Sequence, residues 1–321
     1  MGIMNKVQII VAIAILVSAP AIGKPLKFLT ANVGNMTISS ASHDRQFKIS
    51  EYDLPVLKDN IAAINPDVVF LQEIDGKGKQ QEKRIFGKKY QTRCSEDMCT
   101  AINGDVLEFI GECEGEGKGY MLCAARVLNS KKIEEKCSEE KSGYVCVSKR
   151  TLASNEVVKL FNVHGASPAD DKGFSKRSGQ ICGILDMMKK FQKAGFIIIT
   201  GGDFNFDPVY ESKQYNKKND RSDPLFNLNV CWGDMFSAPD ASDLKIVSPN
   251  EPTWFTKKVS LLVFDKQLTN SLDHVITNLK SKKCKVLSSD QTRLDVDRTK
   301  DGKKRKPFMD HRGVLCDMTL P

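Results

Sequence analysis

Short apolar runs recur along the chain, and polar residues follow each of them. Uninterrupted apolar runs of four to eight residues are typical of buried strands. The alternation of these runs with polar, helix-compatible stretches favours α/β layering in one large domain. In chain order, the strand-associated segments are residues 26–30, 66–71, 157–163, 196–200, 271–276 and 309–314.

The run 196–200 is followed directly by two glycines and then by Asp203 and Asn205. Open α/β sheets bind their ligands at the carboxyl edge of the strands. A carboxylate holds a metal or a water there, and a carboxamide donates to a phosphate oxygen, so the pair suits phosphate chemistry. The alternative is an ordinary turn, because Asp, Asn and Gly are also common turn residues.

Matching polar residues accompany the other strand segments. They are Asn32, Gln72, Glu73, His164, Asp273, His274, Asp310 and His311. The chain has only 4 histidines, and all except His43 belong to this set. A histidine within a strand is often structural, and that alternative stays open for His274.

This ordered set resembles the motifs of the endonuclease/exonuclease/phosphatase superfamily, whose type member is deoxyribonuclease I. The resemblance extends from about Leu26 to the C-terminus, and the segment 164–170 is most similar to secreted deoxyribonucleases. It implies an α/β fold: a four-layer α/β sandwich of two packed mixed β-sheets flanked by helices. Residues 24–321 would form this domain, with a Cys-rich insertion around 76–150. Ile181, Ile184 and Met188, at helical spacing, resemble the helix that follows the His motif.

The sequence departs from the superfamily pattern at three positions. Met309 stands where the last motif usually has Ser, and Gly313 replaces a Pro. Asp75 stands where secreted deoxyribonucleases carry an Arg that contacts DNA. These differences argue against close kinship with the digestive nucleases.

The resemblance implies roles for five residues in a metal-dependent phosphodiesterase. His311 would act as general base, since an imidazole accepts a proton from water near neutral pH, and Asp273 would orient it. His164 would protonate the leaving oxygen or bind the phosphate. Asp203 and Asn205 would position water and phosphate.

The resemblance also implies a metal site. Glu73 with Asn32 would hold Mg²⁺, with Asp310 nearby, and Mn²⁺ or Ca²⁺ are alternatives. Carboxylate and amide oxygens are hard ligands that suit these cations. The acid partner of His164 is not identified by any motif, and Glu108 and Glu112 are the candidates.

The N-terminus predicts a secretory signal peptide over residues 1–23. Lys6 precedes an apolar run at 7–17, which is shorter than the about 20 residues of a membrane span. Cleavage is expected after Gly23, or after Ala21. We therefore expect a secreted or periplasmic protein with no transmembrane segment after cleavage; an uncleaved signal anchor is the alternative.

The chain has 10 cysteines, which favours an oxidising compartment and disulfides. Zinc is the rival interpretation, but no Cys-x-x-Cys pair occurs. Local spacing suggests three pairs, although spacing alone does not determine connectivity. These pairs are Cys94–Cys99, Cys113–Cys123 and Cys137–Cys146.

The formal net charge is +8, from 48 basic and 40 acidic residues, so the protein attracts polyanions. Basic stretches at 213–221 and 298–306 follow or precede site motifs. The resemblance of the segment 164–170 to secreted deoxyribonucleases, the basic charge and the predicted secretion together make DNA the expected substrate and an endonuclease the expected activity. Anionic lipid head groups are the other candidate partner, with a sphingomyelinase-type phospholipase C or phosphoinositide phosphatase as the alternative function. A binding protein that has lost catalysis is a third possibility.

Overall fold

The computed structural model describes most of the region covered by the resemblance. The described residues are 23–34, 53–74, 78–95, 97–115, 117–128, 137–140, 143–146, 156–166, 171–208, 224–236, 243–256, 268–287, 299–300, 303–304 and 311–321. The predicted signal peptide 1–23 lies outside these residues except for Gly23, as do Asp310, the basic stretch 213–221 and most of 298–306.

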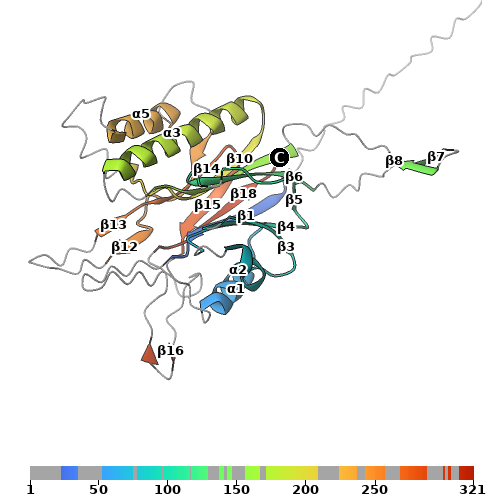
Figure 1. Ribbon diagram of the computed structural model, residues 1–321, viewed down its shortest axis with the longest axis horizontal. Helices are drawn as coiled ribbons and strands as arrows, with labels where there is room; N and C mark the ends of the chain where they lie inside the picture. The colour runs from blue at the N-terminus through green and yellow to red at the C-terminus, as the bar shows by residue number, and fades with distance from the viewer. Residues whose placement is uncertain are drawn as a thin grey trace, which may run out of the picture.

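Two six-stranded sheets form the centre of the molecule (Figure 1). The first sheet has the order β15 (Lys280–Val286), β18 (Val314–Thr319), β1 (Pro25–Asn32), β2 (Val68–Gln72), β4 (Met98–Asn103) and β3 (Tyr90–Cys94). The second has the order β11 (Lys245–Ile246), β14 (Asp273–Thr277), β10 (Ile197–Asp203), β9 (Val157–His164), β6 (Tyr120–Val127) and β5 (Leu107–Phe109). Three further pairs are β7 (Cys137–Glu140) with β8 (Gly143–Cys146), β12 (Trp254–Thr256) with β13 (Leu268–Asn270), and β16 (Thr299–Lys300) with β17 (Lys303–Lys304).

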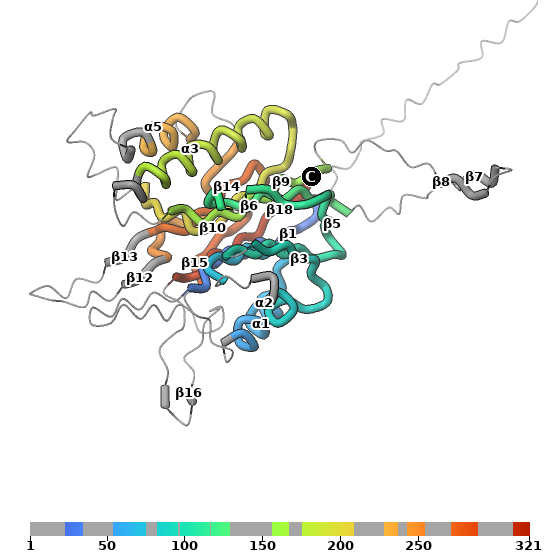
Figure 2. Tube along the Cα trace, viewed as in Figure 1, coloured from blue at the N-terminus to red at the C-terminus, as the bar shows by residue number. Residues whose placement is uncertain are grey.

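Helices cover the outer face of each sheet, which completes the four predicted layers (Figures 1 and 2). Helices α3 (Asp171–Lys193) and α5 (Pro224–Phe236) cover the second sheet, and α1 (Asp53–Ile64) and α2 (Gly78–Ile85) cover the first. The predicted helical residues Ile181, Ile184 and Met188 are fully buried against the second sheet. The predicted fold class is therefore confirmed.

Apolar side chains fill most of the interior between the sheets, as the apolar strand runs predict. Phe28 and Phe70 of the first sheet and Leu160 and Ile199 of the second are fully buried in one cluster. Removing this area from water stabilises the fold by about 25 cal/mol per Å² of apolar surface. The strands are thus held in a fixed relation, which sets the positions of the residues at their ends.

Both sheets are mixed, and this mixture brings the motifs together. β1 pairs with β2 in parallel, and β9 with β10 in parallel, so two strand ends meet in each sheet. β14 pairs antiparallel with β10, so the start of β14 lies beside the end of β10. The final motif lies directly before a strand, because His311 precedes β18, which begins at Val314. Arg312 N donates to Thr253 O at 2.7 Å.

Four disulfides connect described cysteines. Cys94–Cys99 and Cys113–Cys123 are confirmed, and Cys182–Cys231 and Cys284–Cys316 join the dispersed cysteines. Cys137 lies opposite Cys146 across the β7–β8 pair, and that third bond stays a prediction. None of the helices within the described residues combines the length and the apolar character needed to cross a membrane.

Candidate active site

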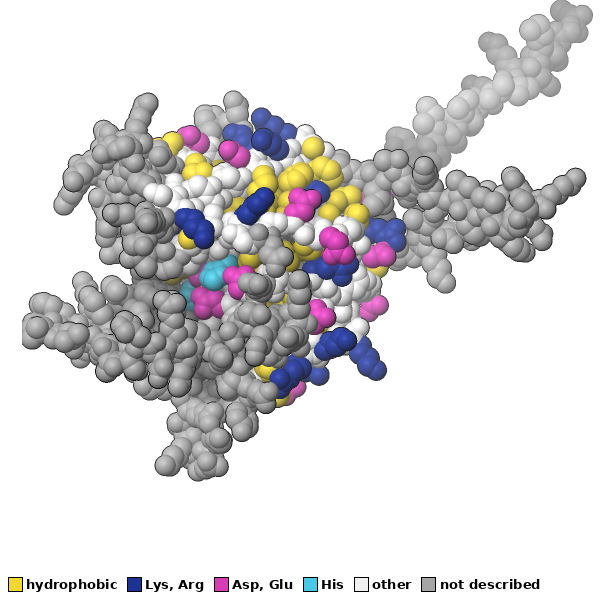
Figure 3. Space-filling model, viewed as in Figure 1, with side chains coloured by type: hydrophobic (Ala, Val, Ile, Leu, Met, Phe, Trp, Pro, Cys, Tyr) yellow, Lys and Arg dark blue, Asp and Glu magenta, His cyan; other side chains and the backbone are white. Residues whose placement is uncertain are grey.

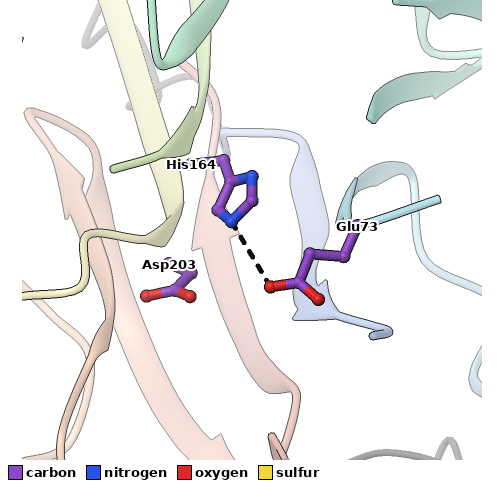
Figure 4. Close-up of side chains that lie close together, drawn as sticks. All are labelled: Glu73, His164 and Asp203. Carbon is purple, nitrogen blue, oxygen red and sulfur yellow. Dashed lines mark ion pairs between the residues drawn. The ribbon is translucent and has the colours of Figure 1, made fainter. Parts of the chain in front are cut away.

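Five predicted site residues converge at one end of the two sheets. Asn32 ends β1, Glu73 follows β2, and His164 and Asp203 end β9 and β10. In the ladder, Asp203 lies opposite His164 on one side and Asp273 on the other. Figure 4 shows Glu73, His164 and Asp203 facing a common space from separate elements.

Unusual backbone conformations accompany these residues. Glu73 and Asn205 have positive φ angles of 57° and 49°, a region that costs a side-chain-bearing residue about 1–2 kcal/mol. Gly202, just before Asp203, has φ 142°, and a Cβ there would lie 2.0 Å from the Val163 carbonyl oxygen. Only glycine fits this position, so Gly202 of the motif has a direct steric reason.

The Asn32 side chain holds two carboxylates together. Its Nδ2 donates to Glu73 Oε1 at 2.9 Å and to Asp203 Oδ2 at 3.0 Å, while its Oδ1 accepts from Gly34 N at 2.9 Å. Asn32 and Asp203 are buried. Two acidic groups, which would repel one another, are thus kept close by a shared donor.

The donor set fits a divalent cation. Ligand atoms of Glu73, His164 and Asp203 lie within 4.8 Å of one another. Mg²⁺ typically takes one or two carboxylates and fills its remaining positions with water and substrate phosphate. Glu73 retains 24% of its side-chain exposure, so one carboxylate is accessible to an ion from solvent. Asn32, Glu73 and Asp310 as metal ligands stay predictions.

His164 is paired with Asp97, a residue the sequence analysis missed. His164 Nδ1 lies 2.9 Å from Asp97 Oδ2. The candidates Glu108 and Glu112 are not its partners: Glu108 accepts from Arg126 at 2.5 Å, and Glu112 lies 3.6 Å from Arg93 Nε. The only signal available for Asp97 was an acidic residue in the short turn between Cys94 and Cys99.

The electrostatic surroundings of His164 favour its protonated form. Burial alone lowers the pKa of His164, but hydrogen bonds to Asp97 and Glu73 and the charge of Asp203 outweigh it and raise the pKa to about 10. The hydrogen bond from His164 lowers the pKa of Asp97. Burial tends to raise the pKa of Glu73, but bonds from His164 and Asn32 bring it below its usual value. At neutral pH the metal-free site therefore holds an imidazolium beside ionised carboxylates.

His311 forms the second histidine–carboxylate pair. Its Nδ1 lies 2.8 Å from Asp273 Oδ2, and its Nε2 lies 3.7 Å from Asp203 Oδ2. All three side chains are buried. Burial raises the pKa of Asp203, and the charge of His311 opposes that shift. Asp273 N donates to Thr253 Oγ1 at 3.1 Å, which fixes the start of β14.

The Asn205 side chain is engaged within the protein. Its Nδ2 donates to Gly165 O at 2.9 Å and to Asp203 Oδ2 at 3.2 Å, and its backbone N donates to Asp203 Oδ1 at 2.7 Å. Arg177, fully buried on α3, donates to the Asn205 carbonyl oxygen. Asn205 therefore orients Asp203, and its predicted role in positioning phosphate stays a prediction.

His274 lies apart from the other two histidines of the described chain. Its Nε2 is 2.8 Å from Phe206 O, and its ring packs against Phe204 and Trp232 at centroid distances of 5.6 and 5.3 Å. Burial lowers the pKa of His274. The structural alternative left open for this residue is therefore the one that the geometry supports.

The site reaches the molecular surface. In Figure 3, histidine side chains lie beside acidic side chains at the level where the two sheets meet. His164 is 20% exposed and Asp97 47% exposed, whereas His311 and Asp273 are almost completely covered. One histidine pair thus contacts solvent and the other lies deeper in the protein.

Comparisons with known proteins identify the fold. No protein-family model and no curated protein matches the chain. Among solved structures, zebrafish TDP2 complexed with a single-strand DNA product has a TM-score of 0.55 and 15% identity over 92% of this chain and 99% of that one. TDP2 from Caenorhabditis elegans has a TM-score of 0.54 and 13% identity over 92% and 75%. An endonuclease/exonuclease/phosphatase from Beutenbergia cavernae has a TM-score of 0.51 and 13% identity over 92% and 72%. At these identities the likeness is one of fold.

Proposed function

We propose, from the premise that the chain has the fold of the endonuclease/exonuclease/phosphatase superfamily, that it is a metal-dependent phosphodiesterase that hydrolyses the DNA backbone. One observation carries the proposal. Two histidine–carboxylate pairs, His164–Asp97 and His311–Asp273, flank a cluster of carboxylates that fits a divalent cation. An acid and a base on either side of a cation site are the groups that in-line displacement at phosphorus requires.

Glu73, Asp203 and Asn32 are the described residues that would hold the cation, together with Asp310. A divalent cation in this place supplies positive charge against the anionic phosphodiester and its transition state. Asn32 contributes by holding the carboxylates of Glu73 and Asp203 in fixed positions through its Nδ2. These hydrogen bonds therefore fix the positions of the two carboxylates before any ion binds.

His311 is the proposed general base. Asp273 accepts from Nδ1 at 2.8 Å, which leaves the Nε2 lone pair directed toward Asp203 and the cluster. A water held by Asp203 would lose its proton to Nε2 as it attacks phosphorus. The acid–His pair stabilises the imidazolium that results, as in other hydrolases.

His164 is the proposed general acid. Its raised pKa keeps the ring protonated at neutral pH, and Nε2 lies at the side of the cluster nearest Glu73, 3.4 Å from Oε1. The leaving oxygen of the broken P–O bond would take its proton from Nε2, while Asp97 holds the ring through Nδ1. The proposed roles require a protonated ring at His164 and a ring at His311 that accepts a proton at Nε2.

The charge of the chain is compatible with DNA and with an anionic lipid surface, and one comparison favours DNA. The chain carries a net charge of +8, and a basic protein attracts the phosphate backbone. The zebrafish TDP2 structure of the same fold contains a single-strand DNA product. A phospholipid substrate is tested in parallel below.

A cleavage assay on four substrates, each with Mg²⁺ and each with EDTA, tests this proposal. The substrates are supercoiled plasmid, RNA, sphingomyelin and a phosphoinositide. We expect plasmid nicking that EDTA abolishes and that His311→Ala lowers at least about 10²-fold, the scale for loss of a general base. His274→Gln is the matched control, because His274 is buried in an aromatic cluster; it should retain activity. Cleavage of lipid alone would reverse the substrate assignment, and full activity of His311→Ala would refute the role of the base.

We also propose that the mature protein comprises residues 24–321 and acts outside the cell. The four disulfides support this because such bonds persist in oxidising compartments. N-terminal sequencing of protein recovered from the culture medium should begin at Lys24. Retention of the full chain in the membrane fraction would contradict both statements.

A further inference from the structure

Asp97, the partner of His164, lies in a turn that a disulfide closes. β3 and β4 form an antiparallel hairpin in which Cys94 lies directly opposite Cys99. These two cysteines are bonded, with a Cα–Cα distance of 4.1 Å and a sequence separation of 5. Asp97 is therefore inside a small covalent ring at the tip of the hairpin.

The Asp97 carboxylate needs such support more than the other site carboxylates do. Its side chain is 47% exposed, whereas those of Asp203 and Asp273 are 1% and 0% exposed. Water competes for an exposed carboxylate, so packing alone does not hold it against His164. The turn must therefore fix the position of the Asp97 carboxylate.

The hairpin carrying Asp97 lies at the margin of the first sheet. β3 is the edge strand, and every residue of it is partly exposed. Edge elements with few buried contacts open locally at low free-energy cost. Asp97 directly precedes β4, which is buried and pairs with β2. The disulfide therefore acts by keeping the partly exposed strand β3, and with it the Cys94 side of the turn, closed against β4 where Asp97 begins.

The same turn also contacts the segment that follows Glu73. Ile74 N donates to the Asp97 carbonyl oxygen at 3.1 Å. Within the turn itself, Ser95 N donates to Met98 O at 2.8 Å. The backbone of Asp97 is thus tied to the carboxylate side of the site, and its side chain is tied to the histidine side. A displacement of the turn would disturb both.

We propose that the Cys94–Cys99 disulfide is a positioning element of the active site, which acts on the reaction through Asp97 and its hydrogen bond to His164. The catalytic consequence rests on the proposed phosphodiesterase function, but the effect on the His164–Asp97 pair does not. Small displacements of a positioned catalytic group reduce rates strongly. We expect loss of the bond to lower kcat about tenfold.

The first test is a set of variants with a matched control. Cys94→Ala/Cys99→Ala removes the bond, and Cys284→Ala/Cys316→Ala removes another cross-strand bond of the same sheet with the same Cα–Cα distance of 4.1 Å. The control bond joins β15 to β18 opposite Phe28, several residues before the Asn32 end of β1. Only the first double variant should lower kcat.

Each double variant is then combined with Asp97→Asn. If the disulfide acts through Asp97, its removal changes kcat by less than about twofold once Asp97 is replaced, because coupled residues are not additive. A merely structural bond would lower kcat by the same factor in both backgrounds. Equal factors would overturn the proposal.

The second test needs no enzyme activity. In metal-free protein, the Nδ1–H proton of His164 gives an NMR resonance that reports its bond to Asp97. We expect this signal to broaden or disappear in Cys94→Ala/Cys99→Ala and to persist in Cys284→Ala/Cys316→Ala. If the alanine variant does not fold, Cys94→Val/Cys99→Val keeps an apolar cross-strand pair and replaces it. A folded variant with a wild-type His164 signal overturns the proposal, whether or not the protein cleaves DNA.

Discussion

Replacing Asp273 by Asn should test the orientation of the His311 ring separately from the stability of the fold. Asp273 Oδ2 accepts from His311 Nδ1 at 2.8 Å with both side chains buried, so the carboxylate selects the tautomer whose Nε2 accepts a proton. An amide of the same shape can donate to Nδ1 and favour the wrong tautomer. We expect kcat to fall about 10²–10⁴-fold, which corresponds to about 3–5 kcal/mol in the activation free energy.

The cost in stability should be smaller than the cost in activity. Among the described residues, Asp273 Oδ1 has no hydrogen-bond partner. In Asp273→Asn, the amide group would be unsatisfied either at the former Oδ1 position or opposite His311 Nδ1. A buried unsatisfied group costs about 1–3 kcal/mol. Loss of a buried charge offsets part of that cost. The free energy of unfolding should therefore decrease less than the activation free energy rises.

The assay is plasmid nicking in Mg²⁺ at matched concentrations of folded protein, with urea unfolding of the same samples. Asp207→Asn is the control, because Asp207 is also buried but accepts from the Ser271 backbone N at 3.0 Å. The control should keep kcat within about threefold. A folded Asp273→Asn variant with more than a tenth of the wild-type kcat, or an equal loss in Asp207→Asn, would refute the tautomer reasoning.

Three further predictions concern the metal site, the acid and the pH dependence of stability. Gly34→Ala should weaken Mg²⁺ binding in calorimetry at least about tenfold, because a Cβ there would lie 1.8 Å from Glu73 Oε2 and displace that carboxylate. An unchanged Mg²⁺ affinity would show that Glu73 does not hold the ion. Asp97→Asn should lower the pKa of His164 from about 10 toward its usual value of about 6.5 in NMR titrations of metal-free protein, and an unchanged pKa would exclude the pair. Burial lowers the pKa of His274, so below about pH 6.5 the unfolded chain binds a proton that the folded chain does not, and stability falls on acidification. In urea unfolding between pH 7 and 5, His274→Gln should make the free energy of unfolding depend less on pH. A pH dependence equal to that of the wild type would contradict this prediction.

The apolar runs were sufficient to predict the strands that position the site. The run at 196–200 is continuous, and Asp203 lies at the end of the buried strand that it forms. Asp203 illustrates this: its place beside His164 and Asp273 follows from the register of three strands. The final motif was less predictable, because His311 lies before β18 and its neighbour Arg312 bonds to Thr253, a residue distant in the sequence.

Asp97 could not be predicted from its local sequence. It lies in a turn of the Cys-rich region, where no long apolar run marks an element. Its position next to His164 depends on the pairing of β4 with β2 and on the packing of the two sheets, which are long-range contacts. The same holds for the contact of Arg177 on α3 with the Asn205 carbonyl oxygen.

The central claim is that Glu73 and Asp203 share one divalent cation between the two histidine pairs. A crystal grown with Mn²⁺, with anomalous scattering measured at the manganese edge, tests it most directly. We predict a peak about 2.0–2.2 Å from a Glu73 carboxylate oxygen, which disappears in Glu73→Gln. A peak elsewhere in the molecule, with none at Glu73, would contradict the claim.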